Sequence, residues 1–146
     1  MASTLERAAR VINGTHGRLE RDGVRWAETT GFQLKIAKTK ESIKLCGDMM
    51  ERSKTTSLKG TGSVTLYHVD SDVISDDLSI LNGVENPHTL VGTLADPDAV
   101  GAERVAVTGV SFDDITLADW KAATVGTVTK AFTFTGVKLL DTIGVQ

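Results

Sequence analysis

The sequence contains little of what usually identifies a secreted, membrane or metal-binding protein. Its one cysteine, Cys46, cannot form a disulfide within the chain, and no cysteines or histidines stand at the spacing of a zinc site. No apolar run approaches the roughly 20 residues that a membrane-spanning helix needs. The beginning of the chain, MASTLERAARVING, lacks the apolar segment of a secretory signal. These absences predict a protein of the reducing cytoplasm that does not insert into membranes.

What is present is the composition of a globular domain with an uneven charge. The chain has 146 residues, 40% hydrophobic and 24% charged, which predicts a single domain, 1–146, with a core that needs no disulfide or metal. The net charge of -3 argues against sequence-independent nucleic-acid binding. Residues 1–68 carry 12 Lys/Arg and 7 Asp/Glu, a balance of +5, whereas residues 69–146 carry 4 and 12, a balance of -8. Two interpretations stay open: solvated faces that differ by chance, and a polar subunit that associates head to tail.

The first third of the chain predicts an arm, a tight hairpin and a long strand. Residues 1–13 indicate a flexible or short helical N-terminal arm. Asp22 and Gly23 favour a tight turn, because Gly adopts positive φ without steric cost. The segment GFQLKIAK alternates apolar and polar side chains, which is typical of a half-buried strand. The apolar positions then change from even to odd, so we expect a bulge or bend near Thr39–Ser42.

The middle of the chain predicts a long loop followed by one helix. Residues 46–62, CGDMMERSKTTSLKGTG, are polar and turn-rich, and they predict a long inter-strand loop before SVTLYHV resumes the alternation. Residues 70–83, DSDVISDDLSILNG, predict a helix with acidic and hydroxyl residues at its start. Its apolar residues recur at i, i+4 and i+7, and Gly83 is a natural stop.

The last third predicts further strands. His88–Ala95 and 104–112 have strand patterns, separated by a loop from Asp96 through Glu103, and a change of phase at Gly109 is typical of a bulge. The threonine-rich stretch from Thr124 onward predicts a strand with a break at Gly136. Several strands around one helix give a mostly β, α+β domain.

A nucleotide site is the first function to weigh, because SLKGTGSVTLY combines lysine, glycines and hydroxyls. A phosphate-binding loop places its lysine after the glycines and opens a helix. Here Lys59 precedes Gly60 and Gly62, and a strand follows. We expect the two glycines instead to let the backbone bend into that strand.

No catalytic, metal-binding or cofactor-binding residue emerges elsewhere. His16, His68 and His88 are too scattered for a metal site and are expected to be structural or surface histidines. The adjacent pairs Asp76-Asp77 and Asp113-Asp114 project in diverging directions on either a strand or a helix, so solvated acid is the better interpretation.

One cysteine and two tryptophans are further candidates for chemistry or contact. Cys46 lacks a partner and is expected to be a small buried hydrophobe. Trp26 is predicted to lie in the core, whereas Trp120 fits a core or an interface equally.

Three stretches resemble the phage core tail protein family, the tail tube proteins of contractile tails of the PBSX-prophage type. They are INGTHGRLERDG from Ile12, SKTTSLKGTGSVTLYHV from Ser53 and AERVAVTGVSFDDITLADW from Ala102. Their order and spacing agree from Ile12 to Leu140, and the block K-T-T-x-x-x-G-T-G-[ST]-[VL]-T-[LI]-Y is the most specific.

The resemblance implies a fold and an assembly. The fold would be a twisted β-sandwich or partial barrel with one flanking helix. Six subunits would join their sheets into a β-barrel-lined ring, and rings would stack helically into a tube. The implied partners are further copies of the chain, the sheath, tape-measure, baseplate and tail-terminator proteins, and phage DNA in transit. The same tube serves R-type bacteriocins, so the protein would reside in a virion tail or a tail-like particle, with no cofactor and no enzymatic activity.

The resemblance also suggests where rings would meet. We expect the 46–62 loop to reach along the tube axis to the next ring, assisted by the opposite charges of the two halves of the chain. The acid-rich second half is a candidate contributor to a lumen wall that repels phosphates. The candidate interface residues are Met49, Met50, Arg52, Lys54, Thr55, Thr56, Leu58 and Lys59.

Two other classes of function stay open. One is a monomeric or low-order β-rich binding module that recognises a protein partner through the long loop. The other is an enzyme whose site is assembled from distant residues.

Overall fold

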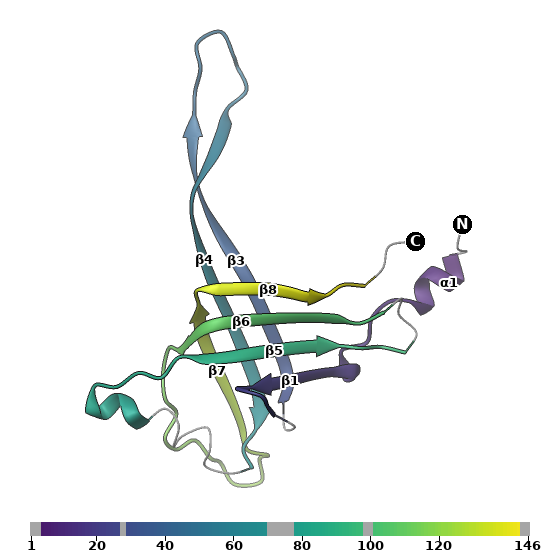
Figure 1. The fold of residues 1–146 in the computed structure, drawn as a ribbon, viewed down its shortest axis with the longest axis vertical. Coiled ribbons are helices and arrows are strands. Elements are labelled where there is room, and N and C mark those ends of the chain that lie inside the picture. The colour runs from purple at the N-terminus through teal and green to yellow at the C-terminus, as the bar shows by residue number, and fades with distance from the viewer. Residues whose placement is uncertain (1–3, 27–28, 70–77, 98–100, 144–146) are drawn as a thin grey trace.

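The computed structural model of the chain describes residues 4–26, 29–69, 78–97 and 101–143. Two antiparallel sheets cross at a large angle and share one strand (Figure 1). The elements in chain order are α1 (Thr4–Ala9), the 3-10 turn η1 (Gly14–His16), β1 (Gly17–Arg21), β2 (Val24–Arg25), β3 (Thr29–Ile43), β4 (Arg52–Tyr67), the 3-10 helix η2 (Leu78–Asn82), β5 (His88–Leu94), β6 (Glu103–Phe112), β7 (Thr127–Phe134) and β8 (Gly136–Asp141).

The shared strand is β6. Along most of its length it pairs with β5 on one side and β8 on the other, and β1 and β2 extend this β5 sheet. At its end, Ser111 and Phe112 pair with β7, which continues through β4 to β3 and forms the β4 sheet. The mostly β architecture predicted from the sequence is confirmed.

The core lies where the two sheets face each other. Alternation along the strands turns every second residue of each sheet toward the other sheet. Trp26 is 5% exposed, which confirms its predicted place in the core. The buried cluster is Leu19, Trp26, Val64, Leu66, Leu90, Val107, Val110, Phe132 and Phe134.

The predicted turn at Asp22 and Gly23 is confirmed and is tied to the next strand. Both residues have positive φ, 51° and 85°, as a two-residue type I′ hairpin turn requires. The Asp22 carboxylate accepts a hydrogen bond from the Thr89 N–H at 2.9 Å and lies 2.8 Å from Nδ1 of the buried His88. Partial burial raises the pKa of Asp22, but the hydrogen bonds with His88 and Thr89, together with the charges of His88 and Arg21, outweigh it and lower the pKa below its ordinary value.

Two predicted irregularities in the strands are also confirmed. The pairing of β3 with β4 shifts register between Thr39 and Lys40, where the sequence pattern changes phase. The pairing of β5 with β6 shifts opposite Gly109, which has a φ of 65°. The predicted strand is also interrupted next to Gly136. β7 ends at Phe134 in one sheet, and β8 begins at Gly136 in the other.

The predicted loop at 46–62 is wrong over most of its length. Residues 52–62 are part of β4 and pair with β3, and the connecting loop spans only 44–51. The segment is polar, but its threonines and serines suit an extended backbone, and ladder hydrogen bonds do not require apolar side chains. The polar composition of residues 52–62 is therefore as compatible with a strand as with a loop.

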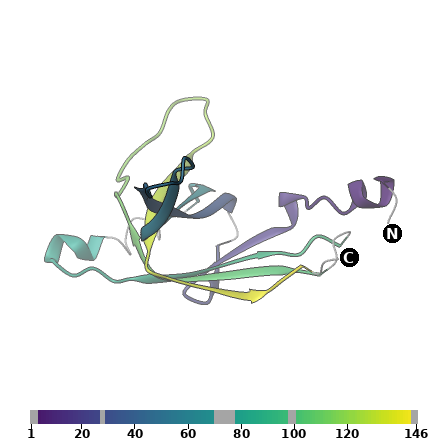
Figure 2. The same ribbon diagram turned by 90° about the horizontal axis from the view of Figure 1, so that it is seen from above.

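The helical predictions have a mixed outcome. The N-terminal arm contains α1, which buries no residue. Of the predicted helix at 70–83, residues 70–77 lie outside the described part of the chain, and Leu78–Asn82 form a 3-10 helix rather than an α-helix. Gly83 ends it with a φ of 78°. No helix among the described residues is long and apolar enough to cross a membrane, and α1 and η2 project on opposite sides of the sheets (Figure 2).

Candidate assembly surfaces

A hairpin arm, residues 38–59, projects beyond the sandwich (Figure 1). It consists of the end of β3, the 44–51 loop and the beginning of β4, and its two strands pair only with each other. All of its residues except Asp48 are exposed. The arm carries Lys38, Lys40, Lys44, Arg52, Lys54 and Lys59 against Glu41, Asp48 and Glu51, a net charge of +3.

The residues predicted as an assembly interface all lie on this arm. Met49 and Met50 are in the tip loop and are 104% and 75% exposed. Leu58, on β4, is 65% exposed. Large apolar side chains held in water away from any core are typical of a surface that is covered by a partner.

The tip of the arm is a defined turn. The Asp48 carboxylate accepts hydrogen bonds from the Met50 N–H at 3.0 Å and from Arg52 Nε at 3.0 Å. Gly47 has a φ of 82°, in the left-handed region that favours glycine. The tip therefore holds Met49 and Met50 in a hydrogen-bonded turn.

Gly60 and Gly62 lie where the arm joins the body, and their role there is not evident from the sequence. Both lie within β4 and pair with Phe134 and Phe132 of β7. A Cβ atom at either position would come within 2.5 or 2.6 Å of the facing phenylalanine ring. The expectation that these glycines bend the backbone is replaced by another role: they leave room for two aromatic rings over the strand.

The opposite end of the molecule is acidic. The acidic end comprises residues 83–87, between η2 and β5, and residues 113–121, after β6. It carries Glu85, Asp113, Asp114 and Asp119 against Lys121, a net charge of -3. A cleft of about 280 Å³ opens between these two segments, with Ile80, Val84 and Ile115 among its lining residues. The Ser111 hydroxyl donates a hydrogen bond to Glu85, which joins the two sides of the cleft.

Cys46 and Trp120 are both exposed. Cys46 is exposed near the tip of the arm, so the prediction of a small buried hydrophobe is wrong. The arm contains no core into which a thiol could pack. Trp120, for which core and interface were equally plausible, is 83% exposed at the acidic end. An exposed tryptophan is typical of an interface.

A third surface is an apolar groove of about 750 Å³ where the two sheets diverge. Phe32, Leu34 and Ile36 of β3 face Val105 and Val137 of the β5 sheet across it. Val137 is 52% exposed. β3 and β8 are the outermost strands of their sheets in the described structure, so unpaired backbone groups border the groove.

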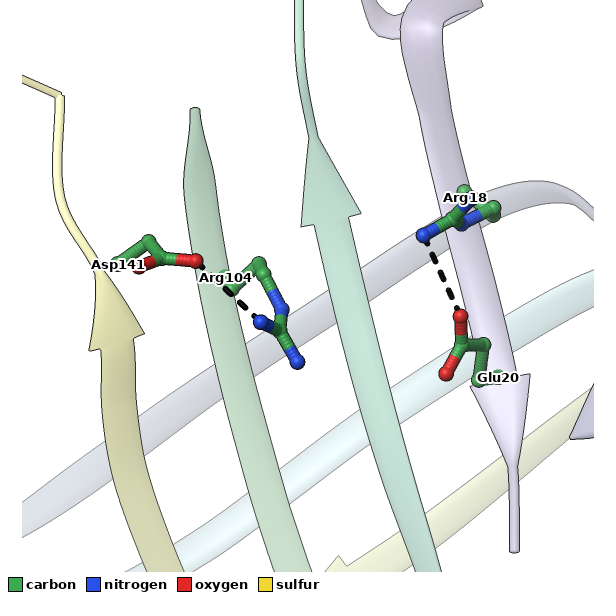
Figure 3. A network of polar contacts seen from close by, with 4 residues as sticks. All are labelled: Arg18, Glu20, Arg104 and Asp141. Carbon is green, nitrogen blue, oxygen red and sulfur yellow. Dashed lines mark hydrogen bonds and ion pairs between the residues drawn. The ribbon is translucent and has the colours of Figure 1, made fainter. Parts of the chain in front are cut away.

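The outer faces of the two sheets differ in chemistry. On the β5 sheet, Arg18 pairs with Glu20 at 3.3 Å and Arg104 with Asp141 at 3.4 Å (Figure 3). The outer face of the β4 sheet instead carries three cross-strand rows of mostly small and hydroxyl residues. These rows are Gly31, Thr65 and Thr129; Gln33, Ser63 and Ala131; and Lys35, Thr61 and Thr133.

Among the described residues no cluster of His, Cys, Asp or Glu could hold a metal ion. The described surface features are a projecting basic arm, an acidic end, an apolar groove and unpaired sheet edges.

The family follows from comparison with known proteins. Residues 5–141 match the model of the family described as phage tail tube protein, and the chain belongs to this family. It is therefore a structural protein and not an enzyme. Two Bacillus subtilis (strain 168) proteins are 32% identical over 114 residues: the phage-like element PBSX protein XkdM and the uncharacterized protein YqbM. In both cases the match covers 77% of this chain and 78% of the relative.

Solved structures show the same fold at low sequence identity. A chain of the sheath–tube complex of an extracellular contractile injection system, PVC, in its extended state superposes with a TM-score of 0.69 at 7% identity, covering 97% of this chain and 100% of that one. A chain of the anti-feeding prophage baseplate gives a TM-score of 0.63 at 10% identity, covering 85% and 90%. A chain of a gene transfer agent virion gives 0.56 at 11% identity, covering 88% and 98%.

Proposed function

We propose that six copies of this chain close into a ring, and that rings stack head to tail into the inner tube of a contractile phage tail or tail-like particle. The observation that carries the proposal is the polarity of the molecule: a basic arm with exposed methionines projects from the body, and an acidic, apolar-lined cleft lies away from it. Surfaces that differ and complement each other form heterologous contacts, which continue as rings or tubes. The family and the fold of the injection-system chain support the same conclusion.

Ring closure would use the groove and the free edges of the sheets. A neighbouring copy that pairs with β3 or β8 satisfies their outer backbone groups and covers the exposed part of the groove. A closed circle of sheets leaves no edge open to unwanted pairing. This accounts for apolar residues such as Val137 and Leu139 that are more than half exposed in the single chain.

The lumen would be lined by the outer face of the β4 sheet. Lys35 is the one charged residue among the nine in the three rows described above. A face of threonine, serine and glutamine offers DNA neither a row of cations nor large apolar side chains to adhere to. The lumen wall would thus be hydroxylated and nearly uncharged, with Lys35 as the one charge in these three rows.

The partners beyond the tube would be those of a contractile tail. The similar solved chains come from a sheath–tube complex, a sheath and tube terminator, and a baseplate. We infer that this chain contacts a sheath protein along the tube, a terminator at one end and a baseplate at the other. A tape-measure protein would occupy the lumen during assembly, and phage DNA would pass through it on ejection.

Contacts between rings would be made by the arm residues Met49, Met50, Arg52, Lys54, Thr55, Thr56, Leu58 and Lys59. The electrostatic part of this proposal is tested by reversing the sign of Lys54 and Lys59 together. Because exposed charges act strongly only at low ionic strength, the variant should assemble more weakly at low salt. Normal polymerisation of purified K54E/K59E rings would contradict the electrostatic contribution.

Negative-stain microscopy and light scattering of the purified protein test the whole proposal. Hollow tubes or six-membered rings at high protein concentration are the expected result. A compact monomer that does not elongate from purified baseplates would instead favour the binding-module interpretation.

A further inference from the structure

The two ends of the molecule match each other in three independent respects. The arm has a net charge of +3 and the acidic end a net charge of -3. The arm tip exposes unbranched methionines, and the acidic end offers an apolar-lined cleft. Along the longest axis the arm projects from one side of the sheets, and the loop after β6 extends from the other (Figure 1). A contact between them therefore repeats from copy to copy along one direction.

Methionine suits this contact because its side chain is flexible and adapts to irregular apolar space. Ile80, Val84 and Ile115 supply apolar walls, whereas Asp113 and Asp114 are exposed at the rim. Lysines flanking the tip would approach these two carboxylates when the methionines enter. Trp120 and Leu117, 83% and 63% exposed, extend the apolar surface next to the cleft.

We infer that the cleft at the acidic end is the receptor for the arm tip of a second copy in the adjoining ring. Met49 and Met50 fill the apolar part of the cleft, while basic residues of the arm pair with Asp113 and Asp114 at its rim. This inference rests on the proposed function, because it names the surface that the arm contacts. The charged rim sets the direction and register of stacking, and the buried methionines supply most of the affinity.

The exposed Cys46 near the tip provides a native probe. Ile115→Cys places a second thiol in the cleft, and a short thiol-specific bismaleimide is added to assembled tubes. Because each copy then carries one thiol at each end, a denaturing gel should show a ladder of linked chains. The ladder should disappear in Cys46→Ser/Ile115→Cys. Lys138→Cys on the outer face of β8 is the matched control and should give no ladder of the same intensity.

A charge exchange tests the rim independently. Asp113→Lys/Asp114→Lys should raise the protein concentration needed for tube growth at low salt by about tenfold, as the loss of two exposed pairs per contact predicts. Combining it with Lys44→Glu/Lys54→Glu, which reverses the two lysines that flank the tip, should restore growth to within about threefold of the native protein. Circular dichroism and thermal unfolding of each variant check that the sandwich remains folded.

The outcomes separate this inference from the proposed function. Tubes that grow normally but give no Ile115→Cys ladder and no charge rescue would overturn the cleft as receptor and leave the tube intact. A ladder together with rescue supports it. Failure of the native protein to form any ring or tube would overturn the proposed function and this inference with it.

Discussion

The body and the hairpin arm share the strands β3 and β4 but are stabilised in different ways. In the body, β4 packs Val64 and Leu66 against the other sheet and both are essentially unexposed. In the arm, the same strand has no facing sheet and is held by its ladder with β3 and by a few exposed side-chain hydrogen bonds. An isolated two-stranded hairpin is marginally stable in water. The fold of the arm therefore depends on its attachment to the body and on the copy that would cover it in the proposed tube.

The largest effect on stability is expected in the body. Phe132→Ala should lower the free energy of unfolding by about 3–5 kcal/mol, because it removes a large ring from a closely packed core and leaves a cavity. Leu58→Ala in the arm is the matched comparison and should change stability by less than about 0.5 kcal/mol, since that side chain is 65% exposed. Urea unfolding followed by circular dichroism measures both. Equal losses in the two variants would mean that the arm has a core of its own.

A smaller effect is expected at the junction between the two regions. Gly62→Ala places a methyl group 2.6 Å from the Phe132 ring and from the Gln33 carbonyl, so overpacking should cost about 1–3 kcal/mol. Gly14→Ala is the control, because nothing lies within 4 Å of a Cβ built there. Thermal unfolding and hydrogen exchange of the arm should both report the change. An unchanged melting temperature would show that the ring moves aside at no cost.

The turn that ties β1 to β5 should make stability depend on acid. The pKa of Asp22 is lowered in the folded protein, so its contribution is present above the unfolded value of about 4 and is lost as the pH falls through the folded value. Asp22→Asn should therefore be less stable near pH 7 and lose less stability on acidification. Asp119→Asn, at an exposed site, serves as the control. Parallel pH profiles for native protein and Asp22→Asn would contradict this account.

The smallest effect on folding is expected at the tip, where the effect on assembly should be greatest. Met49→Ser/Met50→Ser should leave the melting temperature of the single chain unchanged, because both side chains are exposed. Tube growth measured by light scattering should weaken and should not be restored by lowering the salt. A drop in melting temperature without loss of assembly would reverse the assigned roles of tip and body.

Local patterns predicted a good part of this fold. The change of apolar phase after Ile36 marked the bulge at Thr39, and the Asp22-Gly23 pair marked the turn, because both features depend on neighbouring residues. The extended backbone of 52–62 was missed because the partner that holds it, β3, stabilises it through backbone hydrogen bonds that leave no apolar pattern. The roles of Gly60 and Gly62 depend on two phenylalanines about 70 residues later in the chain.

The candidate surfaces were predictable to different degrees. The arm residues from Met49 to Lys59 are contiguous, so the sequence could group them. The acidic end brings Glu85 beside Asp113 and Asp114 only because β5 and β6 pair antiparallel, with His88 opposite Val110. No spacing in the sequence indicates that these carboxylates share one cleft. The burial predicted for Cys46 was wrong because its exposure depends on the tertiary structure. The arm packs against no other element, and neighbouring residues in the sequence do not indicate this.

The antiparallel pairing of β4 with β7 determines how the subunit would carry a mechanical load. Eight residues of β4, from Gly60 to Tyr67, pair with β7 along the direction in which the arm projects. Tension applied at the tip would therefore act on these hydrogen bonds in shear, all of them together, rather than opening them one after another. The ladder then passes the load to β6, which belongs to both sheets. A ring loaded in tension through its arms would therefore deform little and would resist unfolding.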